Sequence, residues 1–250
     1  TIQNSVTKLK HKLLPSFLRL SFLALAIASC GSPEGQSDSE GNGEDRVLDS
    51  LTAVLKEDPE NVSALVARAD YYLEVKNFPY AKMDAQAAFT VDSANHDALR
   101  VLGDAHYVSN ETRISRDAWQ RCAGLFPEDV ECRLKLAELY QVVMEYGKSS
   151  KVVDEVLALD PNNPTAYYIK GINVRDEKGD TNVALAYIQK AIDLNPNYEV
   201  ALDMAGVLHS AKGNPLVLSY FERLATLRPD DFNVYYKVGM FHLGVKNWNS

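Results

Sequence analysis

Cysteine and histidine are the residue types in this sequence that could bind a transition metal or act as a nucleophile or base. The chain of 250 residues has three cysteines, Cys30, Cys122 and Cys132, and five histidines. The cysteines lack the paired short spacings of a zinc site, so the sequence predicts no metal centre. Cys122 and Cys132 flank a turn at Pro127, where they either form a disulfide in an oxidising compartment or pack as two buried thiols.

The histidines are expected to pack rather than to react. His106, His209 and His242 recur at one place of the 34-residue pattern described below, so at least one repeat separates each from the next and they cannot share one ion. The sequence has no metalloprotease, hydrolase, phosphate-loop or dinucleotide-binding motif, and no nucleophile is paired with a base. We therefore expect no cofactor, no metal and no enzymatic activity.

The first thirty residues have the layout of an export signal. Lys8, Lys10 and Lys12 precede a largely apolar segment, which ends in small residues before Cys30. The uninterrupted apolar stretch, 20–29, is ten residues long, whereas a helix needs about 20 residues to cross the hydrocarbon core. The segment is therefore not expected to remain as a membrane span.

Residues 27–30, Ile-Ala-Ser-Cys, resemble the lipobox of bacterial lipoproteins. The resemblance implies removal of residues 1–29, a diacylglycerol on the Cys30 sulfur and an acylated amino group, which together suffice for stable anchoring. Residues 30–45 hold five acidic residues, four glycines and no base, a composition that predicts a flexible tether. The resemblance implies a lipid-anchored protein of the bacterial cell envelope, on the periplasmic or the surface-exposed side of the outer membrane.

The composition is that of a folded protein that does not bind nucleic acid. Hydrophobic residues make up 46% of the chain and charged residues 24%, which provides a core and excludes a disordered chain. The net charge is −8, and loss of the four basic residues within 1–29 makes it −12. No basic stripe follows residue 20, so the clustered cations that phosphate contacts require are missing.

From residue 46 onward the sequence repeats with a period of 34. Four prolines are spaced by 34, 35 and 33 residues, and a series of glycines shares their register: Pro127, Pro161, Pro196 and Pro229, with Gly103, Gly171, Gly206 and Gly239. Between these markers the apolar residues recur at three and four, the helical period. In 130–163, two such stripes flank Tyr146-Gly147, which predicts a helix, a tight turn and a second helix that proline ends.

These residues resemble the tetratricopeptide repeat family, whose 34-residue units place leucine seventh, glycine or alanine eighth, an aromatic eleventh and proline thirty-second. The unit from His96 has Leu102, Gly103, His106 and Pro127 at those places. The resemblance implies an all-α fold, a right-handed superhelical solenoid of helix-turn-helix repeats. Full units are expected at 62–95, 96–129, 130–163, 164–198 and 199–231, with a lone second helix at 46–61 and a partial unit at 232–250.

Some residues depart from the family pattern. Arg68 and Lys170 stand at the seventh place, where leucine is typical, and Arg133 stands at the fourth, where a bulky residue is typical. The last unit stops where its second helix should begin, and the chain starts at Thr1 rather than methionine. Because a solenoid normally ends in a polar cap, we expect the sequence to be a fragment truncated at both ends.

In the family, the second, fifth, ninth and twelfth places of each unit face the concave surface. Here five of the twelve such places in the first three units are acidic, whereas those of the later units are mainly apolar or aromatic. This pattern predicts a groove for a protein segment with basic character at one end and apolar anchors at the other. The alternative is a solvated acidic face beside an apolar half that missing residues cover. The candidate groove residues are Asp70, Asp104, Glu138, Tyr168, Ile172, Asp203, Val207 and Tyr236.

The combined interpretation is a non-catalytic, membrane-tethered scaffold that binds protein partners in the bacterial envelope. One alternative is a surface lipoprotein that captures glycans or nutrients, with Tyr168 and Tyr236 stacking on sugar. Another is an adaptor at the N-terminus of a longer enzyme. The short turns favour the scaffold, because helical-repeat proteins that bind glycans normally carry long insertions between helices.

Overall fold

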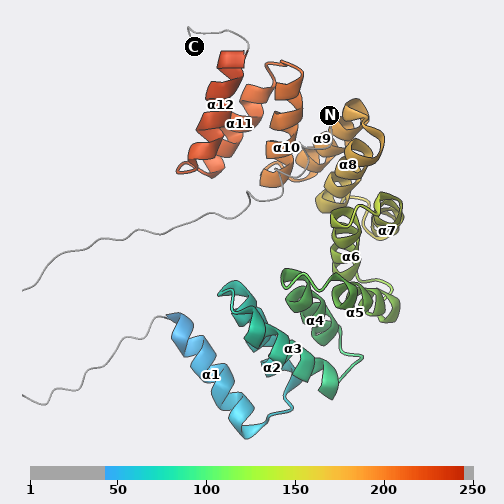
Figure 1. The fold of residues 1–250 in the computed structure, drawn as a ribbon, viewed down its shortest axis with the longest axis vertical. Coiled ribbons are helices and arrows are strands. Elements are labelled where there is room, and N and C mark those ends of the chain that lie inside the picture. Colours follow the sequence, from blue (N-terminus) through green and yellow to red (C-terminus); the bar gives the residue numbers. More distant parts are fainter. Residues whose placement is uncertain (1–42, 245–250) are drawn as a thin grey trace, which may run out of the picture. The chain divides into compact units, whose positions relative to one another are not determined.

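The structure is a computed structural model, and it describes residues 43–244. Within that range the chain forms twelve α-helices and no strand (Figure 1). The all-α expectation is therefore confirmed. The helices are α1 (Gly43–Glu57), α2 (Val62–Glu74), α3 (Phe78–Val91), α4 (His96–Val108), α5 (Thr112–Leu125), α6 (Glu131–Val142), α7 (Tyr146–Leu159), α8 (Pro164–Lys178), α9 (Thr181–Leu194), α10 (Glu199–Ala211), α11 (Val217–Leu227) and α12 (Phe232–Gly244).

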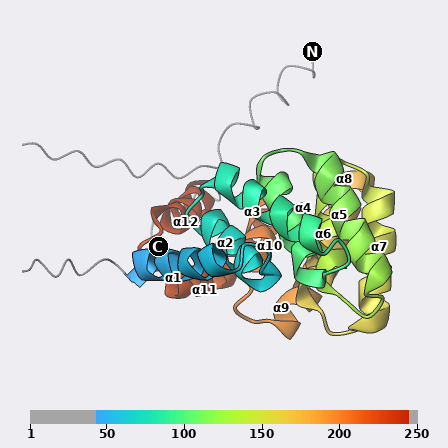
Figure 2. The same ribbon diagram turned by 90° about the horizontal axis from the view of Figure 1, so that it is seen from below.

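Consecutive helices pair as hairpins, and each hairpin packs on the next. The pairs are α2 with α3, α4 with α5, α6 with α7, α8 with α9 and α10 with α11, and each of the five full predicted units holds one pair. The second helix of a pair contacts the first helix of the next, and first helices also meet directly where α2 contacts α4 and α6 contacts α8. The same order can be followed from a second direction in Figure 2.

The buried side chains form three adjoining apolar clusters, over α1 to α5, α4 to α8 and α8 to α12. Because α4 and α8 each contribute to two clusters, no hairpin has a core of its own. This sharing is the physical basis of a repeat array, in which stability comes from interfaces between neighbours. None of the helices in the described part of the chain is long and apolar enough to cross a membrane.

The export signal, Cys30 and most of the predicted tether lie outside the described residues, as do residues 245–250. The tether prediction is wrong at its C-terminal end, because α1 begins at Gly43 and not after residue 45. Composition sets no sharp boundary here, since the first turn of a helix needs no buried residue and tolerates acidic residue types.

The turn inside 130–163 also differs from the prediction. α7 begins at Tyr146, so the turn comprises residues 143–145 and not Tyr146-Gly147. Its central residue, Met144, has a left-handed backbone with φ 63°, and the Glu145 amide donates to the Tyr140 carbonyl at 2.8 Å. That bond is the six-residue link of a Schellman motif. The same left-handed conformation occurs in the corresponding turns of the other units, at Lys76, Asn110, Gly179 and Gly213. Only two of these five turn residues are glycine, so glycine alone does not locate the turns in the sequence.

Within the hairpins, side-chain sizes are matched across the closest approach of the two helices. A Cβ on Gly103 would lie 2.1 Å from the Trp119 indole nitrogen. In the five complete hairpins, this small-residue place holds glycine opposite a large side chain and alanine opposite a smaller one. The glycine pairs are Gly103 with Trp119, Gly171 with Ile188 and Gly206 with Phe221, and by register the alanine pairs are Ala69 with Ala85 and Ala137 with Val153.

The charged residues that depart from the family pattern have local partners. Arg68 forms a two-pronged ion pair with Asp84 of α3, at 2.6 and 2.8 Å. Lys170 contacts Asp154 of α7 at 2.6 Å. Arg133 instead donates to backbone carbonyls at the end of α5 and in the turn that follows it. These contacts satisfy the charges where the family pattern has apolar packing.

Candidate functional site

The predicted groove residues lie on first helices, and ion pairs connect these helices from one hairpin to the next. The Arg100 guanidinium on α4 contacts Asp70 of α2 at 2.6 and 3.1 Å, and Asp104 of its own helix at 3.1 Å. Lys135 on α6 reaches Asp104 at 3.0 Å. The predicted acids Asp70 and Asp104 are therefore paired, and the front half is a charge ladder over α2, α4 and α6.

The ladder keeps an excess of negative charge. It has five carboxylates, Asp70, Asp97, Asp104, Glu131 and Glu138, against the two cations of Arg100 and Lys135. Burial raises the pKa of Glu138, and the negative charge of Asp104 raises it further. The positive charge of Lys135 acts in the opposite direction and lowers the pKa. Glu138 also lines a hollow of about 170 Å³ with Tyr107 and Trp119. A cationic side chain placed there would relieve the repulsion among the carboxylates.

The middle of the predicted groove offers less free surface than the sequence indicates. Ile172 is only 5% exposed and belongs to the core over α8 to α12, so its prediction as a groove residue is wrong. Its side chain is buried in the apolar cluster that α8 shares with α9 and α10. Tyr168 is half-buried, with its ring edge against Tyr198 at 5.6 Å between centroids.

The apolar end of the predicted groove is exposed on α10 and α12. Val207 is 41% exposed, Tyr236 56% and Met240 48%. The three side chains line one hollow of about 150 Å³. Asp203 does not join them as a free charge, because it pairs with Lys237 of α12. That ion pair connects the first helices of the last two units, as Arg100 connects those of the first two.

The three histidines at the shared repeat place are separated, as expected, and serve local packing. His106 is buried and its Nδ1 contacts the Glu111 carboxylate. The His209 ring stacks on Tyr220 at 5.3 Å between centroids, and burial together with the charge of Lys212 lowers its pKa. His242 lies in the last turn of α12.

One cluster of metal-ligating residue types was missed from the sequence. His96, Cys122, Asp129 and Cys132 each place one ligand atom within 4.8 Å of the others, and this is the one such group in residues 43–244. The signal was available in the repeat: His96 opens one unit, Asp129 closes it, and Cys132 lies just inside the next. Ends of adjacent units meet in a stacked array, although they are about 34 residues apart in sequence.

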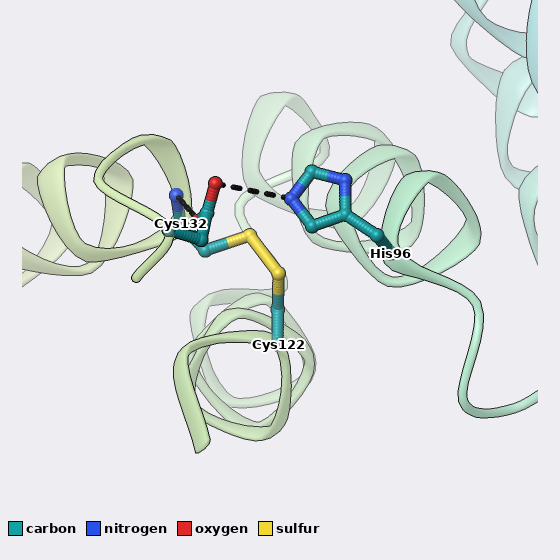
Figure 3. A group of neighbouring side chains, drawn as sticks. His96, Cys122 and Cys132 are labelled. Atoms are coloured by element: carbon teal, nitrogen blue, oxygen red, sulfur yellow. Dashed lines mark hydrogen bonds and ion pairs between the residues drawn. A yellow bond between two sulfur atoms is a disulfide. The ribbon is translucent and has the colours of Figure 1, made fainter. Parts of the chain in front are cut away.

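Of the two alternatives for the cysteines, the structure has the disulfide. Cys122 in α5 and Cys132 in α6 are bonded, with their Cα atoms 6.1 Å apart (Figure 3). Both cysteines are fully buried. The bond ties the second helix of one unit to the first helix of the next.

Comparisons with known proteins indicate the fold. No protein-family model matches the chain. The chain is 24% identical over 106 residues to the mitochondrial import receptor subunit TOM70 of rat and of mouse, a match that covers 42% of this chain and 17% of each receptor subunit. It therefore spans less than a fifth of the length of these curated relatives.

Solved structures resemble the chain over most of its length. A chain of the APC/C hetero-tetramer Cut9-Hcn1 aligns with a TM-score of 0.70 at 16% identity, over 82% of this chain and 41% of that chain. A tetratricopeptide repeat protein from Parabacteroides merdae aligns with 0.65 at 16% identity, over 80% and 79%. YrrB, a tetratricopeptide repeat protein with an unusual peptide-binding site, aligns with 0.52 at 17% identity, over 76% and 97%. The described chain has the tetratricopeptide-repeat fold, a right-handed superhelical solenoid of helical hairpins.

Proposed function

We propose that this protein is a non-catalytic scaffold that binds a protein segment along its first helices and is held at a bacterial membrane by a lipid on Cys30. The observation that carries the proposal is the exposed apolar hollow between α10 and α12. Like the charge ladder on α2, α4 and α6, it is formed mainly by the first helices of the repeats. Exposed aromatic and methionine side chains around a hollow are the usual anchors of a protein interface.

The size of the hollow favours a peptide side chain over a whole ligand. Its volume is about 150 Å³, whereas pockets for small molecules typically enclose about 300 Å³ or more. The expected partner is an extended or helical segment that inserts one apolar side chain near Tyr236 and places cations against Glu138. Tyr168 is engaged with Tyr198 and is not free to stack on sugar, so no observation favours the glycan alternative.

The similar proteins are consistent with this proposal. YrrB is described as having a peptide-binding site, and TOM70 is a subunit of an import receptor. Peptide binding is therefore a function that the same fold supports in YrrB. The membrane tether rests on the sequence of residues 1–30, the export-signal layout and the lipobox resemblance.

Paired alanine substitutions test the binding surface. Tyr236→Ala with Met240→Ala, two exposed side chains of the hollow, is expected to weaken partner binding at least tenfold, because such anchors contribute about 1–2 kcal/mol or more each. The matched control is Tyr80→Ala with Tyr235→Ala, two exposed tyrosines outside the predicted groove places. The partner is first identified by a photo-crosslinking residue at position 236 in intact cells, and affinity is then measured with the purified partner.

Equal loss of binding in both double variants, or adducts from position 80 but not from position 236, would place the binding surface elsewhere. Helical circular dichroism of each variant shows that the fold is retained. In the same cells, Cys30→Ser is expected to move the protein from the membrane fraction to the soluble fraction. Retention of Cys30→Ser in the membrane fraction would refute the lipid anchor without affecting the groove.

A further inference from the structure

We propose that His96, Cys122, Asp129 and Cys132 form a tetrahedral zinc site when the disulfide between the two cysteines is reduced. The α4–α5 hairpin and the α6–α7 hairpin would then be linked by a disulfide under oxidising conditions and by a zinc ion under reducing conditions. The proposal does not depend on the groove or on the lipid anchor.

The four ligand atoms are already close to zinc-binding geometry. They lie within 4.8 Å of one another, and His96 Nε2 is 3.1 Å from Asp129 Oδ1. In a tetrahedral zinc site with bonds of about 2.0–2.3 Å, neighbouring ligand atoms are about 3.3–3.8 Å apart. Assembly therefore requires the sulfur–sulfur bond to open and the longest separations to shrink by about 1 Å, with no change in the helix order.

His96 is oriented as zinc-binding histidines usually are. Its Nδ1 lies 3.0 Å from Asp97 Oδ1, while its Nε2 faces Asp129. An imidazole between two carboxylates needs a cation, which is either a second ring proton or a metal ion. With the Nδ1 proton donated to Asp97, the Nε2 lone pair is available to zinc, and the carboxylate behind the ring fixes its orientation.

Asp129 is held by a rigid turn. Its Oδ2 accepts the Cys132 amide at 2.7 Å, which leaves Oδ1 directed to His96. Arg133 fastens the turn by donating to the carbonyl of Asp129 at 2.5 Å and to that of Ala123 at 3.2 Å. Cys132 lies in the first turn of α6, where the partial positive charge of a helix N-terminus stabilises a thiolate. Figure 3 shows His96 and the two cysteines converging from three helices.

The chemistry of the switch balances with a dithiol as reductant. A donor thiolate attacks one sulfur of the disulfide, and the other cysteine leaves as a thiolate. The donor's second thiolate then displaces the remaining cysteine, so the donor ends as a disulfide and supplies both electrons. Zinc binds the two thiolates, the Asp129 carboxylate and neutral His96, while the two protons of the donor dithiol and the Nε2 proton of His96 pass to solvent. Two sulfur ligands with one nitrogen and one oxygen suit zinc among the common divalent ions.

The test compares the purified full chain before and after reduction with a phosphine, using zinc in competition with a chromophoric chelator. The reduced protein is expected to bind one zinc ion per chain, and the disulfide form none. Cobalt in place of zinc is expected to give the intense visible absorption of a tetrahedral thiolate site. His96→Ala and Asp129→Asn are expected to weaken zinc binding at least tenfold in the reduced protein, and Asp97→Asn about 10–100-fold.

The control variant is His242→Ala on α12, which is expected to leave zinc affinity unchanged. Asp129→Asn keeps an acceptor for the Cys132 amide, so its effect reports the lost charge and not a broken turn. Equal zinc binding by the oxidised and reduced proteins, or unchanged affinity in both His96→Ala and Asp129→Asn, would overturn the proposal. If reduction unfolds the chain, zinc is expected to restore the helical circular dichroism, and failure to restore it would also overturn the proposal.

Discussion

Gly103→Ala is expected to lower the free energy of unfolding by about 1–3 kcal/mol, as overpacking of a close contact does. The added methyl carbon would lie 2.1–2.5 Å from three atoms of the Trp119 indole. Trp119 is 2% exposed and its ring nitrogen donates to the Arg100 carbonyl at 3.3 Å, so the ring cannot turn aside freely. The measurement is equilibrium unfolding in urea, followed by circular dichroism.

Gly239→Ala is the matched control for this overpacking. Gly239 occupies the same repeat place on α12, but a Cβ there would meet no described atom within 4 Å. Alanine is a better helix former than glycine by about 1 kcal/mol, so this variant is expected to be neutral or more stable. A similar loss of stability in both variants would show that close helix packing is not the reason for glycine at Gly103.

Asp84→Ala is expected to lower the free energy of unfolding by about 3–5 kcal/mol, because it leaves the charge of Arg68 buried without its partner. Asp84 is 2% exposed and the Arg68 side chain 15%. The hydrogen bonds that Arg68 donates to Asp84 raise the pKa of Arg68 against the opposing effect of burial. The arginine stays charged without this partner, because a guanidinium group is not deprotonated in proteins. Urea unfolding of the single variant measures the loss.

The double variant Arg68→Leu with Asp84→Ala separates charge from packing. It removes both charges and restores leucine at the seventh place, and we expect it to recover most of the stability that Asp84→Ala loses. Asp154→Asn is the exposed counterpart, since Asp154 pairs with Lys170 but is 62% exposed; its effect is expected within about 1 kcal/mol. A double variant as unstable as Asp84→Ala would contradict the ion-pair explanation.

The sequence predicted the fold because its strongest signals are local. Proline ends the second helix of most units, and the small residue at the eighth place allows the paired helices to approach, so period and pairing follow from single positions. The residues at which individual helices begin and end were less predictable. The turn at Met144 adopts a left-handed backbone without glycine, and the start of α1 has no compositional mark.

Side-chain contacts between units could not be predicted from the same signals. Ile172 stands at a place that faces the groove in the family, yet the close packing around α8 encloses it. Asp70 and Asp104 appeared as free acids, because the reach of Arg100 across to α2 depends on the spacing of neighbouring hairpins. The His96 cluster was missed because its members lie far apart in sequence, three in the unit 96–129 and Cys132 in the next, and only the packed hairpins bring their side chains together.

The central claim is that hairpins stack in chain order and so align their first helices into one surface. Zero-length carbodiimide crosslinking tests it directly, because it joins an amine to a carboxylate only where the two are in contact. Peptide mapping by mass spectrometry is expected to find Lys135 joined to Asp104, Lys170 to Asp154 and Lys237 to Asp203. Crosslinks between units that are not neighbours, in place of these three, would contradict the account.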